Sequence, residues 1–285
     1  MDALHNPVQN RLLARLEHSE LHRLLPYLEL ITLAHGEVLY QVEGKMVYAY
    51  FPTTATISID YLLEDGGTSE IARVGNDGML GVALFMGGQS SAGRALVQAA
   101  GYAYRISAAR LMEEFYHKGP MLQLLLRYTQ VRLTQISQLA VCNSHHTTRQ
   151  RVCGYLLQMQ DRSSADEMAV TQEEIGAALG VRRESITDAA RLLKKLGIIK
   201  WRRGYVTILN RVGLNEHVCE CYAIVRGATL LLLPELPAMV AREKSAWCAG
   251  DRLTVVPLNR EKRRRKAVAS CTLVHVSEQA EFTFV

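Results

Sequence analysis

Residues 170–199 read VTQEEIGAALGVRRESITDAARLLKKLGII, and this stretch decides the fold of the second half of the chain. Thr171 and Glu174 have the spacing of a capping box, which predicts a helix start. Gly180 supplies the turn residue before a second helix over 182–197. Apolar residues recur at helical spacing in both helices and define the faces that we expect to be buried: Ile175, Ala178, Leu179, Ile186, Ala189, Ala190, Leu192 and Leu193. The stretch predicts a helix-turn-helix.

The outer face of the second helix carries side chains that suit base recognition. Its exposed positions include Arg183, Glu184, Thr187, Asp188 and Arg191. Arginine can bridge O6 and N7 of guanine, and glutamate can accept from N4 of cytosine, so a recognition helix needs such residues at its N-terminal end. The alternative is that two packed helices carry a merely solvated charged face.

Residues 198–209, IIKWRRGYVTIL, predict two short strands that fold about Arg202, Arg203 and Gly204. Such a hairpin, or wing, would contact phosphate rather than base edges. Between residues 182 and 203 there are eight basic residues against two acidic ones, a balance of +6 that exceeds the +5 of the whole chain. We expect backbone contacts from Thr171, Ser185, Thr187, Arg191, Arg202 and Arg203.

The first half of the chain has a different pattern of apolar and turn residues. Leucines at roughly helical spacing over 9–24 predict one short amphipathic helix. From residue 28 to 106, short β-rich runs alternate with turn residues, which predicts a β-roll or barrel. The runs are ITLAHGEVLY, MVYAYFP, TATISIDYLL and ALVQAAGYAYRI, with a turn at Asp65-Gly66-Gly67.

A long helix is predicted from Met121 to about Asn143, between a short helix over 108–117 and another over 147–161. It carries a heptad-like seam that can pair with a second copy of the chain: Leu126, Thr129, Leu133, Ile136, Ala140 and Asn143. The competing interpretation is that Leu122, Leu125, Leu126 and Leu133 cover the β-domain.

Taken together, residues 9–226 resemble the Crp/Fnr superfamily of bacterial transcription regulators, most specifically over residues 170–199. The resemblance implies an α+β fold: an N-terminal β-roll (a cyclic-nucleotide-binding-like jelly roll), a long dimerisation helix and a C-terminal winged helix-turn-helix. The family's base-contacting positions fall on Arg183, Glu184 and Asp188, with Arg182 just before them. Asp188 stands where the best-known members carry a second arginine, so their half-site cannot be assumed.

The same resemblance places an effector pocket at Gly78, Met79, Gly81 and Arg94. Met79 stands where nucleotide-binding relatives have glutamate, and the expected Arg-Ser/Thr pair is absent. We therefore expect a structural turn rather than a cyclic-nucleotide site.

We predict no metal site and no iron–sulfur cluster. Iron–sulfur relatives use cysteines near the N-terminus, and the first cysteine here is Cys142. His217, Cys219 and Cys221 have ligand chemistry, but such neighbours more often pack as a helix end, and His145-His146 is interpreted as a hinge. No haem ligand pattern is evident among His5, His18, His22 and His35.

These expectations divide the chain into a sensor-like domain (1–118), a dimerisation helix (119–143), a DNA-binding domain (144–226) and a poorly ordered extension (227–285) with a basic cluster at 260–266. The expected function is a cytoplasmic, homodimeric transcriptional regulator on an inverted-repeat operator, modulated by an effector at the β-roll. Duplex DNA, a second copy and RNA polymerase are the expected partners, with no membrane contact and no catalysis. The alternative is an effector-binding signalling module with a degenerate DNA-binding domain.

Overall fold

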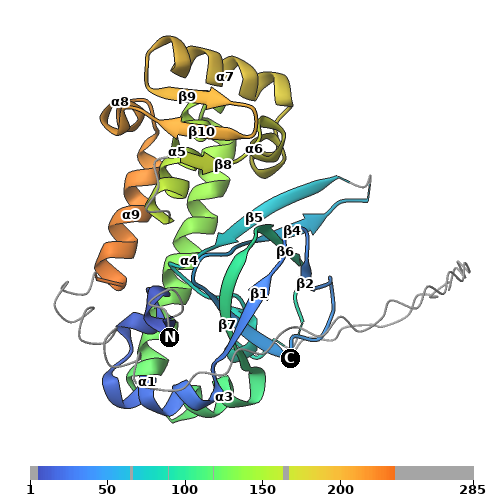
Figure 1. Ribbon diagram of the computed structural model, residues 1–285, viewed down its shortest axis with the longest axis vertical. Helices are drawn as coiled ribbons and strands as arrows, with labels where there is room; N and C mark the ends of the chain where they lie inside the picture. Colours follow the sequence, from blue (N-terminus) through green and yellow to red (C-terminus); the bar gives the residue numbers. More distant parts are fainter. Residues whose placement is uncertain (1–5, 65–66, 89, 118, 163–166, 235–285) are drawn as a thin grey trace, which may run out of the picture.

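The computed structural model describes residues 6–64, 67–88, 90–117, 119–162 and 167–234 (Figure 1). The chain forms a lower β-roll, an upper α/β domain and two long helices that run between them. Among these residues, no helix combines the length and apolarity needed to cross a membrane. The basic cluster at 260–266 and the turn residues Asp65 and Gly66 lie outside the described part.

The N-terminal segment is not the single helix that leucine spacing predicts. It consists of three 3₁₀ turns and one short α-helix: η1 (Pro7–Gln9), η2 (Leu13–Arg15), α1 (His18–Leu24) and η3 (Leu25–Tyr27). The buried Asn10 accounts for part of the break, because its Oδ1 accepts from the amides of Leu12 and Leu13 while its Nδ2 donates to the carbonyls of Pro52 and Gly78. A side chain that satisfies local amides competes with continuous helix.

The β-roll is built from two antiparallel sheets, in the orders β1-β7-β3 and β2-β6-β4-β5. The strands are β1 (Glu29–Leu33), β2 (Val38–Tyr40), β3 (Tyr48–Pro52), β4 (Thr56–Leu62), β5 (Thr68–Val74), β6 (Arg94–Ala99) and β7 (Gly101–Ser107). Ile31, Phe51, Ile57 and Tyr104 are at most 2% exposed and lie in the shared core. This confirms the predicted N-terminal β architecture, although β5 was not among the predicted runs.

One short helix lies within the β-roll, and the other helices follow it along the chain. They are α2 (Val82–Phe85, within the roll), α3 (Ala108–Tyr116), α4 (Pro120–His145) and α5 (Thr148–Arg162). The upper domain adds β8 (Glu167–Ala169), α6 (Gln172–Leu179), α7 (Arg183–Lys195), β9 (Ile199–Arg202), β10 (Tyr205–Ile208) and α8 (Arg211–Glu216). Its sheet has the order β8-β10-β9, and β8 completes it from outside the predicted hairpin. The long helix and the winged helix-turn-helix are therefore both present.

The last described helix, α9 (Glu220–Leu232), returns along α4 toward the β-roll (Figure 1). Leu232 and Leu233 pack against the β-roll core, and the Arg15 guanidinium donates to the Leu233 carbonyl at 2.9 Å. The boundary predicted at residue 226 thus falls inside α9, which continues to Leu232 at the core. The remainder of the predicted extension, 235–285, lies outside the described residues.

Candidate nucleic-acid interface

The first helix of the motif, α6, begins with the predicted capping box. The Glu174 amide donates to Oγ1 of Thr171 at 3.1 Å, and the Thr171 amide donates back to Oε2 of Glu174 at 2.6 Å. Two amides that the helix itself leaves without partners are satisfied in this way. Ile175 is fully buried, and Ala178 and Leu179 pack against the same core.

The turn between the two helices depends on Gly180, which has the left-handed φ of 61° that side chains disfavour. The Arg151 guanidinium of α5 donates to the Leu179 carbonyl at the end of α6. The turn is therefore fixed both by backbone conformation and by a cation from the preceding helix.

The second helix, α7, buries Ile186, Ala189, Ala190 and Leu193 in the core of the domain, while Leu192 is half-buried. Arg182 is its N-cap residue, and Arg182, Arg183, Glu184 and Asp188 are all exposed. Asp188 pairs with Arg191 at 2.8 Å, with both side chains more than 70% exposed. The four residues expected to contact bases therefore share the exposed face at the start of α7.

The residues expected to contact the DNA backbone surround that face. Thr171 is exposed at the start of α6, and Ser185 is half-buried on α7. Thr187 Oγ1 lies 2.8 Å from Oε1 of Gln172 and 3.0 Å from the Arg183 carbonyl, so this hydroxyl already joins the two helices. The contact with Gln172 joins α7 to α6.

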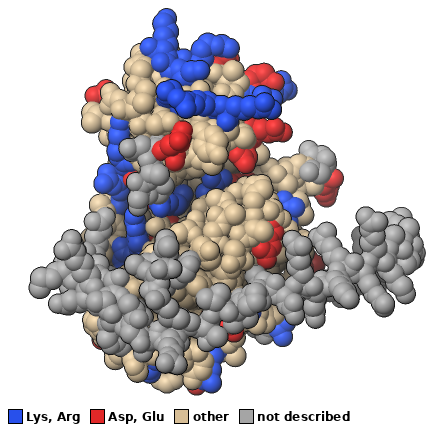
Figure 2. Space-filling model, in the orientation of Figure 1, with Lys and Arg blue, Asp and Glu red and all other residues tan. Residues whose placement is uncertain are grey.

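The predicted wing is the β9–β10 hairpin, in which Arg202 pairs with Tyr205. Gly204, with φ 77°, makes the turn, and its carbonyl accepts from the Val170 amide at 3.0 Å. Arg202 and Arg203 are exposed at the tip. Lysine and arginine side chains gather over α7 and this hairpin at the top of the molecule, with acidic side chains among them (Figure 2).

The seam predicted on α4 is largely exposed in the single chain. Leu126, Leu133 and Ile136 are 47%, 51% and 44% exposed, and Ala140 and Asn143 are exposed as well. Thr129 differs from the prediction, because it is buried on the β-roll side with Leu125, whose carbonyl its Oγ1 contacts at 2.9 Å. Of the alternative residues, Leu125 is buried against the β-roll, whereas Leu126 and Leu133 remain about half exposed.

The loop predicted to hold an effector is closed by Tyr128 of α4. The Tyr128 hydroxyl donates to the Met79 carbonyl and accepts from the Met79 amide, both at 3.0 Å. A Cβ on Gly78 would lie 2.2 Å from that hydroxyl oxygen, so only glycine fits there. This packing agrees with the expected structural turn at Gly78 and Met79.

Met79 and Gly81 line a cavity between the β-roll and α4, which Thr129, Arg132 and Leu133 close from the helix side. Arg132 is the one charged side chain among the described residues of this lining. Gly78 and Arg94 lie outside the lining, in contrast to the predicted pocket. The Arg94 guanidinium instead pairs with Asp60 at 3.6 Å, and burial raises the pKa of that carboxyl despite the pair.

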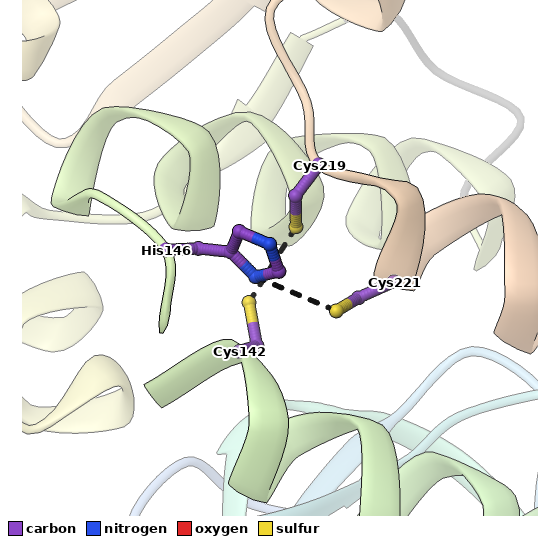
Figure 3. A group of neighbouring side chains, drawn as sticks. All are labelled: Cys142, His146, Cys219 and Cys221. Atoms are coloured by element: carbon purple, nitrogen blue, oxygen red, sulfur yellow. Dashed lines mark hydrogen bonds between the residues drawn. The ribbon is translucent and has the colours of Figure 1, made fainter. Parts of the chain in front are cut away.

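Sequence reasoning missed one cluster of side chains. Cys142, His146, Cys219 and Cys221 point toward one another where α4 meets α9 (Figure 3). His217, which was weighed as a ligand, instead contacts the Gly213 carbonyl through Nδ1 at 2.9 Å. The available signal was two short spacings, Cys-x₃-His and Cys-x-Cys, which are far apart in the sequence and become neighbours only in the fold. Burial raises the pKa of the Cys142 thiol to about 12.

Comparison with known proteins agrees with this architecture. Residues 150–217 match the model of the Crp-like helix-turn-helix domain. The structure is similar to FixK2 from Bradyrhizobium japonicum, with 20% identity, coverage of 67% of this chain and 98% of FixK2, and a TM-score of 0.61. No curated protein matches the chain in sequence.

Two further structures show the same fold. The c-di-GMP responsive global regulator CLP of Xanthomonas campestris is 16% identical, with 67% of this chain and 99% of CLP covered and a TM-score of 0.57. A CRP/FNR family transcriptional regulator from Thermus thermophilus is 22% identical, with coverage of 66% of this chain and 97% of that regulator and a TM-score of 0.55. The chain thus contains a Crp-like helix-turn-helix domain and has the fold of Crp/Fnr family transcriptional regulators.

Proposed function

We propose that this chain is a DNA-binding transcriptional regulator that acts as a homodimer on an inverted-repeat operator. The observation that supports the proposal most strongly is the start of α7, where Arg182, Arg183 and Glu184 are all exposed, as are the two arginines at the tip of the wing. Arginine and glutamate at the start of a recognition helix can read guanine and cytosine in the major groove. The cations at the tip would contact phosphate and set the register.

The exposed face of α4 supports the proposed homodimer. Leu133 and Ile136 lie about one turn apart and are about half exposed, although they are large and apolar. Pairing two copies of α4 would bury both residues and place the two α7 helices about 34 Å apart, one turn of B-DNA. Two-fold symmetry in the protein then requires approximate two-fold symmetry in the operator.

The cavity between the β-roll and α4 supports modulation by an effector. Its lining joins Met79 of the β-roll to Thr129, Arg132 and Leu133 of the dimerisation helix. A ligand bound there would contact the helix that leads to the DNA-binding domain and could shift the populations of DNA-competent and incompetent forms. The mainly apolar lining favours a molecule with substantial apolar surface over a cyclic nucleotide phosphate.

Selection of duplex DNA from a random pool by the purified full chain, at one fixed salt concentration, tests this function. The proposal predicts enrichment of one inverted repeat with half-sites about a helical turn apart. Tight binding without any enriched sequence would overturn sequence-specific regulation and leave the alternative of a signalling module whose DNA-binding domain is degenerate. Contacts with RNA polymerase belong to the same proposal, and transcription from the enriched operator in the presence of polymerase would test them.

A further inference from the structure

The cluster at the junction of α4 and α9 has the composition of a structural metal site. Three cysteines and one histidine form one of the sets that hold structural zinc in tetrahedral geometry. Their ligand atoms all lie within 4.8 Å of one another. Two of the four residues are buried and two are half-buried, so the cluster is not a chance gathering of exposed side chains.

The separations between these atoms fit a single tetrahedral ion. Zinc bonds of about 2.3 Å to sulfur and about 2.0 Å to nitrogen place neighbouring sulfurs about 3.8 Å apart and sulfur and nitrogen about 3.5 Å apart. The Sγ atoms of Cys142 and Cys219 are 3.6 Å apart, and Sγ of Cys221 is 3.5 Å from Nδ1 of His146 (Figure 3). Two edges of the tetrahedron therefore already have nearly the required lengths.

The backbone holds the ligands in place. Cys142 and His146 lie one turn apart at the end of α4, where the His146 amide donates to the Cys142 carbonyl at 3.1 Å. Cys219 is the N-cap residue of α9, and Cys221 lies in its first turn. Two of the sulfur ligands thus stand at the N-terminal end of one helix, and the other two ligands stand at the C-terminal end of another.

The surroundings of the cluster also suit a bound cation. His146 Nε2 lies 3.2 Å from Oε1 of Glu220, which would fix the tautomer that leaves Nδ1 free to bind metal. Three thiolates with one Zn²⁺ carry a net charge of −1, and Arg151 is close enough to interact electrostatically with Cys142 and Cys219. The three cysteines also line a cavity between α4, α5 and β5, which provides a route of entry.

We propose that Cys142, His146, Cys219 and Cys221 bind one zinc ion, which clasps the end of α4 to the start of α9. The clasp includes His146, which together with Thr147 links α4 to α5 at the start of the DNA-binding domain. A disulfide between Cys142 and Cys219 is the competing chemistry. It would use only two of the four ligands and would leave unexplained why His146, with its carboxylate partner, faces Cys221.

The metal content of the full chain tests the site without any use of DNA. A negative result would therefore overturn the zinc site and leave the proposed DNA-binding function untouched. The protein is purified under reducing conditions without chelator, and zinc is measured by mass spectrometry. The expected content is about one zinc per chain. After chelation and reduction, titration with Co²⁺ should restore about one equivalent and produce the absorption of tetrahedral cobalt bound to thiolates.

Variants locate the metal. Cys142→Ser and Cys221→Ser should each lose the zinc, whereas Cys153→Ala should keep it, because Cys153 is buried but lies outside the cluster. The double variant Cys248→Ala/Cys271→Ala, which removes the other two cysteines, should also keep it. Glu220→Gln should retain the site with affinity lower by about 10- to 100-fold, because it alters the partner of the ligating histidine.

Two results would overturn the proposal. One is that the reduced wild-type chain takes up neither Zn²⁺ nor Co²⁺, which does not depend on any variant folding. The other is that metal binding persists undiminished in Cys142→Ser and Cys221→Ser. Hydrogen exchange tests the clasp itself: chelation should speed exchange of amides at 142–147 and 219–223 and leave those of β3 unchanged, whereas equal exchange with and without metal would contradict a clasp.

Discussion

Oδ2 of Asp77 accepts a hydrogen bond from Nε of Arg162 at 3.0 Å, which joins a loop of the β-roll to the last turn of α5. Burial alone would raise the pKa of the Asp77 carboxyl, but the adjacent Arg162 outweighs it, and the pKa is lowered. A lowered pKa in the folded state means that the pair stabilises the fold fully above the ordinary carboxyl pKa of about 4. That stabilisation is lost as the pH falls through the lowered pKa.

Asp77→Asn should therefore lower the free energy of unfolding at pH 7 by about 1–3 kcal/mol, because it removes a charged partner of a largely buried arginine. The difference between wild type and variant should shrink as the pH falls below about 4. Urea unfolding at several pH values measures both effects. A difference that stays constant between pH 7 and pH 3 would show that the ion pair is not its source.

Tyr128→Phe should destabilise the contact between α4 and the β-roll. The Tyr128 hydroxyl serves both the amide and the carbonyl of Met79, which is 1% exposed. Its removal leaves two buried backbone groups without this partner, at a cost of about 1–3 kcal/mol. Tyr116→Phe, at a position 69% exposed, is the matched control and should change thermal stability little.

Leu133→Glu should shift the chain from dimer to monomer, because two paired helices would bring the new carboxylates together in an apolar interface. Sedimentation over a range of protein concentrations measures the shift. Val212→Glu places the same charge at a residue of α8 that is 71% exposed and should leave the oligomeric state unchanged. A wild-type chain that is monomeric throughout would contradict the assignment of this face.

Arg202→Ala and Arg203→Ala should weaken binding to all duplexes alike. Phosphate contacts release counterions, so each lost contact should reduce the slope of log affinity against log salt by about 1. Arg110→Ala, on α3, removes an exposed arginine far from the wing and should change neither the affinity for duplex DNA nor the salt slope. An unchanged salt slope in the two wing variants would exclude phosphate contacts at the tip.

The helix-turn-helix was predictable because its signals are local. The Thr171–Glu174 capping box, Gly180 and the apolar periodicity each act within a few residues, and the structure places all three as expected. The strand β8 was missed, since three residues carry too little pattern to indicate pairing with β10.

Features that depend on distant contacts could not be predicted in this way. The break near residues 10–17 arises in part from Asn10, which donates to the carbonyls of Pro52 and Gly78. The path of α9 arises from packing on α4. The heptad spacing places Thr129 in the exposed seam of α4, but its side chain is buried on the side of the helix that faces the β-roll. The cysteine cluster joins residues 77 positions apart, so no local pattern could have revealed it.

Selection of DNA by wild type and by Arg183→Ala from the same random pool tests directly whether α7 reads bases. We expect an inverted repeat for wild type. For the variant we expect relaxed preference at one base pair in each half-site, at a cost of about 1–3 kcal/mol in binding free energy on the wild-type operator. An identical enriched sequence for both proteins, or none for wild type, would contradict base recognition by Arg183.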